Sequence, residues 1–269
     1  MSRKRLSALV MALALGLTQG AAAQSLSCSN SADGFDRWKN DFARYAASQG
    51  IGQRGLQALA EARYSSATIA ADRNQRSFGY TLERFMQVRG ADTIVAQARR
   101  RKAQNPEFYA ALERQYGVPA GILLAIHGME TAFGSFMGDT QVVSAIVTLT
   151  FDCRRSDFFR PHALGALRLV DQGSITGATL GARHGELGHT QFLPGNALTY
   201  GVDGNGDGRV DFYNITDAMA STANFLRAKG WRPGQPYQEG SHNFDVLKLW
   251  NAAGVYQRSL AIMGERIDR

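Results

Sequence analysis

A single carboxylate, Glu130, stands in a run from Gly121 to Gly134 that is otherwise almost free of polar side chains. Apolar neighbours remove water from a carboxylate, which disfavours its charged form and raises its pKa. A general acid needs that environment in order to keep its proton near neutral pH. The competing interpretation is a solvated glutamate at the exposed edge of a helix. Because the run offers little exposed face, Glu130 is the first candidate for acid–base chemistry.

His127 lies three residues before Glu130, which places both side chains on one face of a helix. Its imidazole could hydrogen-bond the Glu130 carboxylate or line a cleft. A histidine satisfied within the core is the commoner arrangement, and we favour it.

A glycine-rich stretch from Gly185 to Gly195 carries the second candidate, Gln191. Its glycines suggest a backbone packed tightly against another part of the protein. An amide side chain offers both a donor and an acceptor, which suits sugar hydroxyl and acetamido groups. The alternative is a structural glutamine that is hydrogen-bonded to the backbone of its own loop.

The same stretch contains His184, Glu186 and His189, which together resemble a zinc cluster. The metalloprotease pattern needs two histidines at i and i+4 on a helix, with a glutamate next to the first. Here the histidines stand at i and i+5 among glycines, so the pattern disfavours a zinc site. A zinc hydrolase is nevertheless kept as a competing function.

The third candidate is a loop whose spacing resembles that of an EF-hand. Oxygen-bearing side chains occupy positions one, three and five, a glycine occupies position six, and position seven supplies a main-chain carbonyl. Asn214 replaces the bidentate glutamate expected at position twelve, and a carboxylate three residues later could close the coordination shell. The expected ligands are Asp203, Asn205, Asp207, the carbonyl of Arg209, and Asp217.

Asn214 and Asp217 also have a simpler interpretation, because an asparagine cap followed by an acidic residue commonly starts a helix. Both roles can hold together. We expect a structural hard cation in this loop, namely calcium, with sodium as a replacement. We expect no organic cofactor. A single loop without a paired partner is more typical of a structural site than of a sensor.

The first 23 residues are expected to be a signal peptide. A basic start at residues 3–5 precedes an apolar run at 6–17 and a small-residue cleavage site at 21–23. The apolar run is too short to span a bilayer as a stable helix. The sequence therefore predicts an exported protein, located in the periplasm of a Gram-negative type of envelope.

The chain of 269 residues carries a formal net charge of +7, which falls to +4 once the three basic residues of the leader are removed. This excess is mild, and no stripe of lysine and arginine interleaved with aromatic residues indicates nucleic acid as a partner. Cys28 and Cys153 are the two cysteines. Export places them in an oxidising compartment, so we expect a disulfide between them, with two buried free thiols as the alternative.

Residues 24–269 are expected to form one mainly α unit, with a helical N-terminal lobe at about 30–117, a core at about 118–262 and at most a small β element. The spacing of apolar residues, with the caps and glycines around it, predicts helices near 35–49, 56–62, 93–103, 105–116, 119–131, 142–151, 158–170 and 214–229. Residues 64–80 are expected to be irregular and 173–208 to be glycine-rich loops. The tail from residue 244 should hold one more helix, with a short strand pair as a further candidate.

In this order and spacing, the three stretches resemble the membrane-bound lytic murein transglycosylase B family. Members carry a Gly-x-Glu-Thr-x-x-Gly motif, a Gly-x-x-Gly-x-x-Gln-Phe-x-Pro motif, and an EF-hand-like loop that leads into a helix. The likeness runs from about Phe35 to Tyr256 and includes Asp152-Cys153-Arg-Arg-Ser and Trp250-Asn251-x-x-x-Val-Tyr256. It implies a lysozyme-like α fold and a peptidoglycan substrate.

The resemblance also implies roles for individual residues. Glu130 matches the catalytic acid, and the five loop oxygens match the metal ligands. The expected substrate-binding residues are Gln191, which matches a glycan-contacting glutamine, Asn251 and Tyr256, which match groups lining the cleft, and the motif residues Thr131 and Phe192.

Three places depart from the family pattern. Ala182 stands where some members have a serine near the catalytic glutamate, and His127 replaces a common tryptophan. Gly195-Asn-Ala197 replaces Ser-Ser-Tyr. These differences concern subsite preference and rate rather than the reaction class.

The activity implied by the resemblance is cleavage of the β-1,4 bond between N-acetylmuramic acid and N-acetylglucosamine, with formation of 1,6-anhydro ends and Glu130 as acid and then base. The residues alone leave open hydrolysis with a second acid such as Glu186, because ordinary glycosidases use two carboxylates. A catalytically inactive glycan-binding or scaffolding protein of the same fold is the competing function. The expected partners of a monomeric chain are peptidoglycan glycan strands, with cell-wall synthesis or remodelling proteins as further candidates.

Overall fold

The computed structural model describes residues 26–74 and 79–269, so the leader expected at residues 1–23 lies outside the described residues. Within them the chain forms thirteen helices and one two-stranded antiparallel sheet. The helices are α1 (Phe35–Ser48), α2 (Gln53–Glu61), α3 (Ser66–Arg73), α4 (Leu82–Arg89), α5 (Ala91–Gln104), α6 (Pro106–Tyr116), α7 (Ala120–Thr131), α8 (Val142–Phe151), α9 (Ser156–Gln172), α10 (Pro194–Tyr200), α11 (Ile215–Ala228), α12 (His242–Trp250) and α13 (Gly254–Asp268). The strands are β1 (Thr140–Gln141) and β2 (Leu180–Gly181). None of the described helices is both long enough and apolar enough to cross a bilayer.

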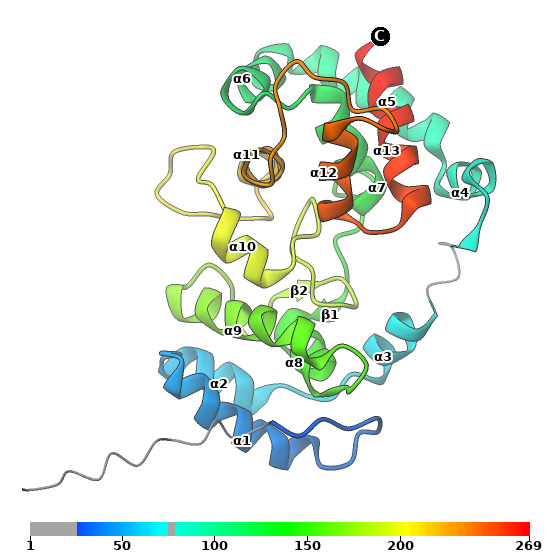
Figure 1. Ribbon diagram of the computed structural model, residues 1–269. Helices are drawn as coiled ribbons and strands as arrows, with labels where there is room; N and C mark the ends of the chain where they lie inside the picture. The colour runs from blue at the N-terminus through cyan, green and yellow to red at the C-terminus, as the bar shows by residue number, and fades with distance from the viewer. Residues whose placement is uncertain (1–25, 75–78) are drawn as a thin grey trace, which may run out of the picture.

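Two groups of helices lie on either side of the small sheet (Figure 1). The lower group comprises α1, α2, α3, α8 and α9, and the upper group comprises α5, α6, α7, α11, α12 and α13. Aromatic rings hold the lower group together, because Trp38 of α1 stacks on Phe42 at 4.9 Å between ring centroids and contacts Phe151 of α8 at 5.3 Å. Stacked and tilted pairs at these distances are favourable.

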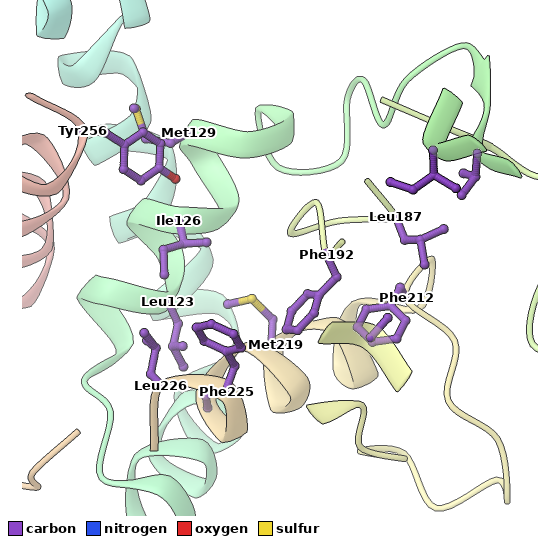
Figure 2. Close-up of a cluster of buried hydrophobic side chains, with 14 of the residues drawn as sticks. Leu123, Ile126, Met129, Leu187, Phe192, Phe212, Met219, Phe225, Leu226 and Tyr256 are labelled. Carbon is purple, nitrogen blue, oxygen red and sulfur yellow. The ribbon is translucent and has the colours of Figure 1, made fainter. Parts of the chain in front are cut away.

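Helix α7 is the centre of the upper group, which explains why its sequence is apolar on every side. All of its residues except Glu130 are buried, and α5, α6, α11 and α13 pack around it. The approach of α13 requires glycine at position 121, since an added Cβ would lie 2.2 Å from the carbonyl oxygen of Gly264. Figure 2 shows Leu123 of α7 meeting Phe225 of α11 in the buried cluster.

The stretch 64–80 was expected to be irregular, and this expectation is wrong because the stretch contains α3. Ser65 caps that helix, since its Oγ accepts a hydrogen bond from the Thr68 amide at 3.1 Å. The residues that α3 buries include Thr68 and Asp72, so the helix leaves no apolar period in the sequence. The following helix, α4, was not predicted either.

Two further expectations are wrong. Residues 173–208 were expected to be loops but include α10, in which glycine serves close packing: a Cβ added at Gly165 of α9 would lie 2.7 Å from Gly195. The tail holds two helices, α12 and α13, and its described residues contain no strand pair. The strands pair instead between residues 140–141 and 180–181. The division into lobes near residue 117 stays a prediction.

The N-terminal segment is fastened to the end of α8. Cys28 and Cys153 form the expected disulfide across a sequence separation of 125. Beside it, the Ser29 amide donates to the carbonyl of Phe151 at 3.0 Å, and the Cys153 amide donates to the carbonyl of Ser29 at 3.2 Å. A crosslink that closes so long a loop stabilises mainly by restricting the unfolded chain.

We expect the double variant Cys28→Ser, Cys153→Ser to be less stable than the wild type. The chain-entropy model gives about 4–5 kcal/mol for a loop of this length, as an upper range. Urea denaturation of both proteins, followed by circular dichroism, measures the difference in free energy of unfolding. Thiol titration of the denatured wild type is the control. Equal urea midpoints, or two reactive thiols in the wild type, would contradict the expectation.

Candidate active site

A cleft of about 760 Å³ opens between the two groups of helices. The lower group contributes Phe158 of α9 to its walls, and Arg155 comes from the turn just before that helix. The upper group contributes Glu130, Trp250 and Tyr256. The chain segment from residue 182 to 196 supplies much of the remaining lining.

Glu130 lies in the last turn of α7 and is partly exposed to the cleft. The helix ends at Ala132, whose φ of 48° is left-handed and therefore strained for a residue with a Cβ. Thr131, expected to bind substrate, is buried instead. Its hydroxyl donates to the carbonyl of His189 at 2.7 Å and accepts from the Gly134 amide at 3.0 Å. Thr131 therefore fastens the turn that follows Glu130.

Two neutral donors reach the same oxygen of the Glu130 carboxylate. Tyr256 Oη and Trp250 Nε1 both donate to Oε1, the indole at 3.2 Å. Figure 2 shows the Tyr256 ring beside Met129 at this end of α7. Because both donors use Oε1, Oε2 is the oxygen that remains to carry a proton.

Burial raises the pKa of Glu130 to about 7. The hydrogen bonds from Tyr256 and Trp250 and the charge of Arg89 pull this pKa downward, while the Glu186 carboxylate adds to the rise. The pKa of Tyr256 is itself raised well above its ordinary value, by burial and then by the Glu130 charge, so the phenol stays protonated and remains a donor. Near neutral pH, Glu130 can give up a proton and take one back.

Gln191 lines the cleft from a strained turn, with a φ of 57°. Its Nε2 donates to the carbonyl of Gly188 at 2.8 Å and to that of Met137 at 3.4 Å. The structural interpretation thus accounts for the nitrogen. Its Oε1 accepts no hydrogen bond from the described residues, so this oxygen remains able to accept from a ligand.

Phe192 and Asn251 also line the cleft and help to fix their neighbours. The Phe192 ring lies 5.2 Å from the Trp250 ring, edge to face. Asn251 stands at the turn between α12 and α13, where its Oδ1 accepts from the Ala253 amide at 3.0 Å and its carbonyl accepts from Gln257 Nε2 at 2.9 Å. These contacts hold the turn that delivers both donors to Glu130.

His127 lies in the core and makes no hydrogen bond to Glu130. It is 2% exposed, and its Nε2 lies 3.1 Å from Nδ1 of His189. Burial lowers the pKa of His127 to about 3, with contributions from His189 and Arg101, so the ring is neutral. The favoured interpretation of a core histidine is confirmed.

The three residues of the zinc alternative are divided between two places. His189 bonds His127 in the core, whereas His184 stands at the cleft wall with Nδ1 3.6 Å from Glu186 Oε1. In the described part of the chain, no group of three or more His, Cys, Asp or Glu side chains is arranged to hold a metal. The geometry gives no support to a zinc hydrolase.

A charged cluster lies beside the cleft, and the sequence singled out its members after α8 only as part of the family likeness. The buried carboxylate of Asp72 accepts hydrogen bonds from the guanidinium groups of Arg154 and Arg155. Burial raises the pKa of Asp72, but the two arginines outweigh it and leave this pKa lowered. A second pair, Arg73 with Asp152 at 2.5 Å, reinforces the contact. The cluster joins α3 to the turn after α8 and so holds Arg155 at the cleft.

Residues 34–241 match the family model described as the transglycosylase SLT domain. The chain belongs to this family. The membrane-bound lytic murein transglycosylase B of Escherichia coli strain K12 is 36% identical over 121 residues, which make up 44% of this chain. The aligned stretch covers 34% of that relative's length.

Two solved structures resemble this transglycosylase SLT domain along most of its length. SltB3 from Pseudomonas aeruginosa, in complex with NAG-anhNAM-pentapeptide, has a TM-score of 0.79 at 25% identity, covering 87% of this chain and 79% of its own. Slt35 from Escherichia coli, in complex with calcium, has a TM-score of 0.71 at 19% identity, covering 90% of this chain and 95% of its own. The family resemblance and the mainly α transglycosylase fold predicted from the sequence are confirmed.

In this transglycosylase domain, the EF-hand-like loop is drawn together by one buried carboxylate. Asp217, fully buried in the first turn of α11, accepts from the amides of Gly204 at 3.0 Å, Asn205 at 3.2 Å and Asp211 at 2.8 Å. It thereby connects both ends of the loop to the helix. The Asn214 side chain accepts from the amide of residue 216 at 2.9 Å, so the interpretation of Asn214 as a helix cap is confirmed.

Asp203 holds the backbone at the start of the loop in a similar way. Its carboxylate accepts from the amides of residues 206, 207 and 208. Asn205 and Asp207 make shorter-range contacts, since Asn205 Nδ2 donates to Asp207 Oδ2 at 2.9 Å. The oxygens of Asp203 and Asp217 thus accept from backbone amides, and the described residues of the loop hold no group of three or more carboxylates arranged to bind a metal.

The raised pKa of Glu130 predicts a stability penalty that depends on pH. The native state keeps this proton up to about pH 7, whereas the unfolded chain loses it near the ordinary value of 4.5. Between these values the native state binds more protons, so the free energy of unfolding falls as pH rises through the window. We expect Glu130→Gln to lack this decrease in the free energy of unfolding. At about pH 8 the variant should therefore melt at or above the wild-type temperature.

Thermal melts of both proteins from about pH 4 to about pH 8 measure the effect. Glu107→Gln, at an exposed position on α6, is the matched control. If the wild type and Glu130→Gln show the same pH dependence, Glu130 does not carry a raised pKa.

Proposed function

We propose that the protein is a peptidoglycan lytic transglycosylase, which cleaves the β-1,4 bond between N-acetylmuramic acid and N-acetylglucosamine and leaves 1,6-anhydro ends. The observation that carries the proposal is the Glu130 carboxyl group, which lines a cleft with its pKa raised to about 7 and neutral donors on one oxygen. Membership of the family supports it, as does the name of the Escherichia coli relative. The complex of SltB3 with an anhydro-sugar peptide points in the same direction.

In the first step, protonated Glu130 gives its proton to the bridging oxygen, and the bond from that oxygen to C1 of the muramoyl residue breaks. The carboxylate that remains is stabilised by Tyr256 Oη and Trp250 Nε1. Both donors are neutral, so they stabilise the anion without supplying the full charge that would strip Glu130 of its proton beforehand.

In the second step, the Glu130 carboxylate takes the proton of the muramoyl C6 hydroxyl as O6 bonds to C1. The ring closes, no water is consumed, and Glu130 regains its proton. Ordinary glycosidases need a second carboxylate as nucleophile or base. Here the substrate supplies its own nucleophile, held close to C1, so a single carboxylate suffices.

The remaining lining suits a glycan strand. Gln191 Oε1 can accept a hydrogen bond from a hydroxyl or acetamido group, and Asn251 stands next to the donors of Glu130. Phe158, with 51% of its surface exposed at the cleft wall, offers an aromatic face to a sugar ring. The substrate is therefore peptidoglycan, and the expected leader would deliver the enzyme to the periplasm, where that polymer lies.

The proposal includes a structural calcium ion in the loop at residues 203–217, with sodium as the alternative occupant. Carboxylate, amide and main-chain oxygens are the ligands that calcium prefers, and the loop supplies all three kinds. The buried Asp217 carboxylate has backbone amides as its partners and pairs with no basic side chain among the described residues. A cation would supply the positive charge that this buried group lacks. Slt35, which has a similar fold, was solved in complex with calcium, and this supports the proposal.

We expect Glu130→Gln to lose activity on purified sacculi by at least about 100-fold, because the amide cannot donate or accept the transferred proton. Mass spectrometry of the released fragments measures the rate and should find 1,6-anhydro ends in the wild-type digest. Glu107→Gln should release fragments at the wild-type rate.

The non-catalytic alternative predicts the opposite results. Wild type that binds sacculi and releases nothing would overturn the proposed activity. So would Glu130→Gln protein as active as the wild type, because the carboxyl group would then have no part in the chemistry.

Calcium should raise the melting temperature of the wild type. An ion that binds the native state alone stabilises it by about 2.7 kcal/mol at a hundredfold excess over Kd. Asp207→Asn removes one ligand charge from an exposed part of the loop and should weaken the response. Sodium chloride at matched ionic strength is the control, which also tests sodium as the occupant. A melting temperature that does not change with calcium would contradict a calcium site.

A further inference from the structure

Glu186 lines the same cleft as Glu130 but comes from a different part of the chain, between β2 and the Leu187–Phe192 bridge. The single-carboxylate reaction has no use for it. We propose that Glu186 is a second catalytic carboxylate, which deprotonates a water molecule that attacks the muramoyl C1, so that the cleft hydrolyses a fraction of the bonds it otherwise cyclises. This inference rests on the proposed function.

The backbone around Glu186 is held firmly. The Leu187 amide donates to the carbonyl of Phe192 at 2.8 Å, and the Phe192 amide donates back at 3.1 Å. The Leu187 side chain is buried in the cluster of Figure 2. The Ala182 amide donates to the carbonyl of Glu186 at 3.0 Å, and a Cβ at Gly181 would lie 2.2 Å from that carbonyl. With its neighbour anchored in the core, the Glu186 side chain lines the cleft.

Donors and charges of both signs surround Glu186, with Arg155 acting to lower its pKa and Asp72 acting to raise it. The His184 amide donates to Oε2 at 3.2 Å, and His184 Nδ1 lies 3.6 Å from Oε1. Burial raises the pKa of Glu186 to about 7, while backbone amides and the charge of Arg155 act to lower it. Asp72 holds that Arg155 guanidinium in place. A carboxylate with this pKa is suited to act as a base at neutral pH.

Glu130 has different partners. Tyr256 and Trp250 are neutral, and the charge of Glu186 opposes the ionisation of Glu130. Burial raises both pKa values to about 7, so near neutral pH the pair populates the state in which Glu130 is protonated and Glu186 is ionised. No hydrogen bond joins the two carboxylates within the described structure. A protonated and an ionised carboxyl group in one cleft are the pair that cleavage with water as the nucleophile requires.

In the hydrolytic step, Glu130 gives its proton to the bridging oxygen, and the bond from C1 to that oxygen breaks. The water oxygen bonds to C1 while Glu186 takes one of the water protons. The products are a free hydroxyl on one sugar and a reducing muramoyl end on the other, and one water is consumed. Exchange of a proton with solvent then returns Glu130 to its acid form and Glu186 to its base form.

Magnitudes predict that this is the minor route. A well-placed intramolecular nucleophile has an effective molarity of roughly 10⁵–10⁸ M. A general base contributes about 10²–10⁴-fold. The C6 hydroxyl is therefore expected to attack C1 in most turnovers, and water attacks C1 where that hydroxyl is poorly placed.

The test compares the ends released from sacculi by wild type, Glu186→Gln and the control Glu107→Gln. Soluble fragments are analysed by mass spectrometry without further digestion, and a Glu130→Gln digest provides the blank. We expect wild type to release reducing ends above the blank. Glu186→Gln should lower the ratio of reducing to anhydro ends at least about tenfold, and this ratio is measured within one digest, so it does not depend on the overall rate of the variant.

Chemical rescue provides a second measurement. Azide needs no deprotonation, so in Glu186→Ala it should attack C1 in place of activated water and give a glycosyl azide. Melting temperatures check that each variant is folded. If the Gln and Ala variants are not, Glu186→Asp retains the charge on a shorter side chain and should also lower the reducing fraction.

The outcomes separate the two proposals. Wild type that releases anhydro ends alone, or an unchanged reducing fraction in the Glu186 variants, overturns the role of Glu186 and leaves the proposed function intact. Wild type that releases neither kind of end overturns the proposed function and this inference with it.

Discussion

In the proposed reaction, the carboxyl group of Glu130 must be dry enough to keep a proton and open enough to meet a substrate. These two demands explain much of the upper group of helices. A helix that is buried on every side, α7, removes water from the group, and burial is the largest cause of its raised pKa. The helix then ends abruptly at Ala132, in a left-handed conformation that costs energy but exposes the last turn to the cleft. Hydrogen bonds from Thr131 to the next loop hold that ending in place.

The two donors on Glu130 come from the far end of the chain, at sequence separations of 120 and 126 residues. They reach the carboxylate because α13 packs along α7, so closely that Gly121 and Gly264 leave no room for a side chain at position 121. Glu130 therefore has its hydrogen-bond donors once the C-terminal helix has docked on α7. Its protonation and the packing of the helices are coupled by this contact, since loss of either donor changes the balance that sets the pKa.

The local parts of this arrangement could be predicted from the sequence. An apolar run with one carboxylate is a local signal, and it predicted both the buried helix α7 and a carboxyl group with a raised pKa at its end. The donors Trp250 and Tyr256 gave no local signal. Tyr256 was connected to the site through a family resemblance rather than through its own chemistry, and Trp250 was not predicted as a site residue. Asp72 lay in a stretch that was expected to be irregular, because a short helix that buries polar groups has no apolar period. Contacts between charges distant in sequence exist only after folding.

The two carboxyl groups of the cleft stand on different kinds of structure, an apolar helix and a loop that faces a charged cluster. Glu130 belongs to an apolar helix and has neutral donors, so its neutral form is favoured. Glu186 belongs to a loop faced by Arg155, whose position depends on Asp72 and on the turn that the disulfide fastens to the N-terminal segment. The upper group thus provides Glu130 and its neutral donors, and the lower group provides the positive charge that opposes the rise in the pKa of Glu186.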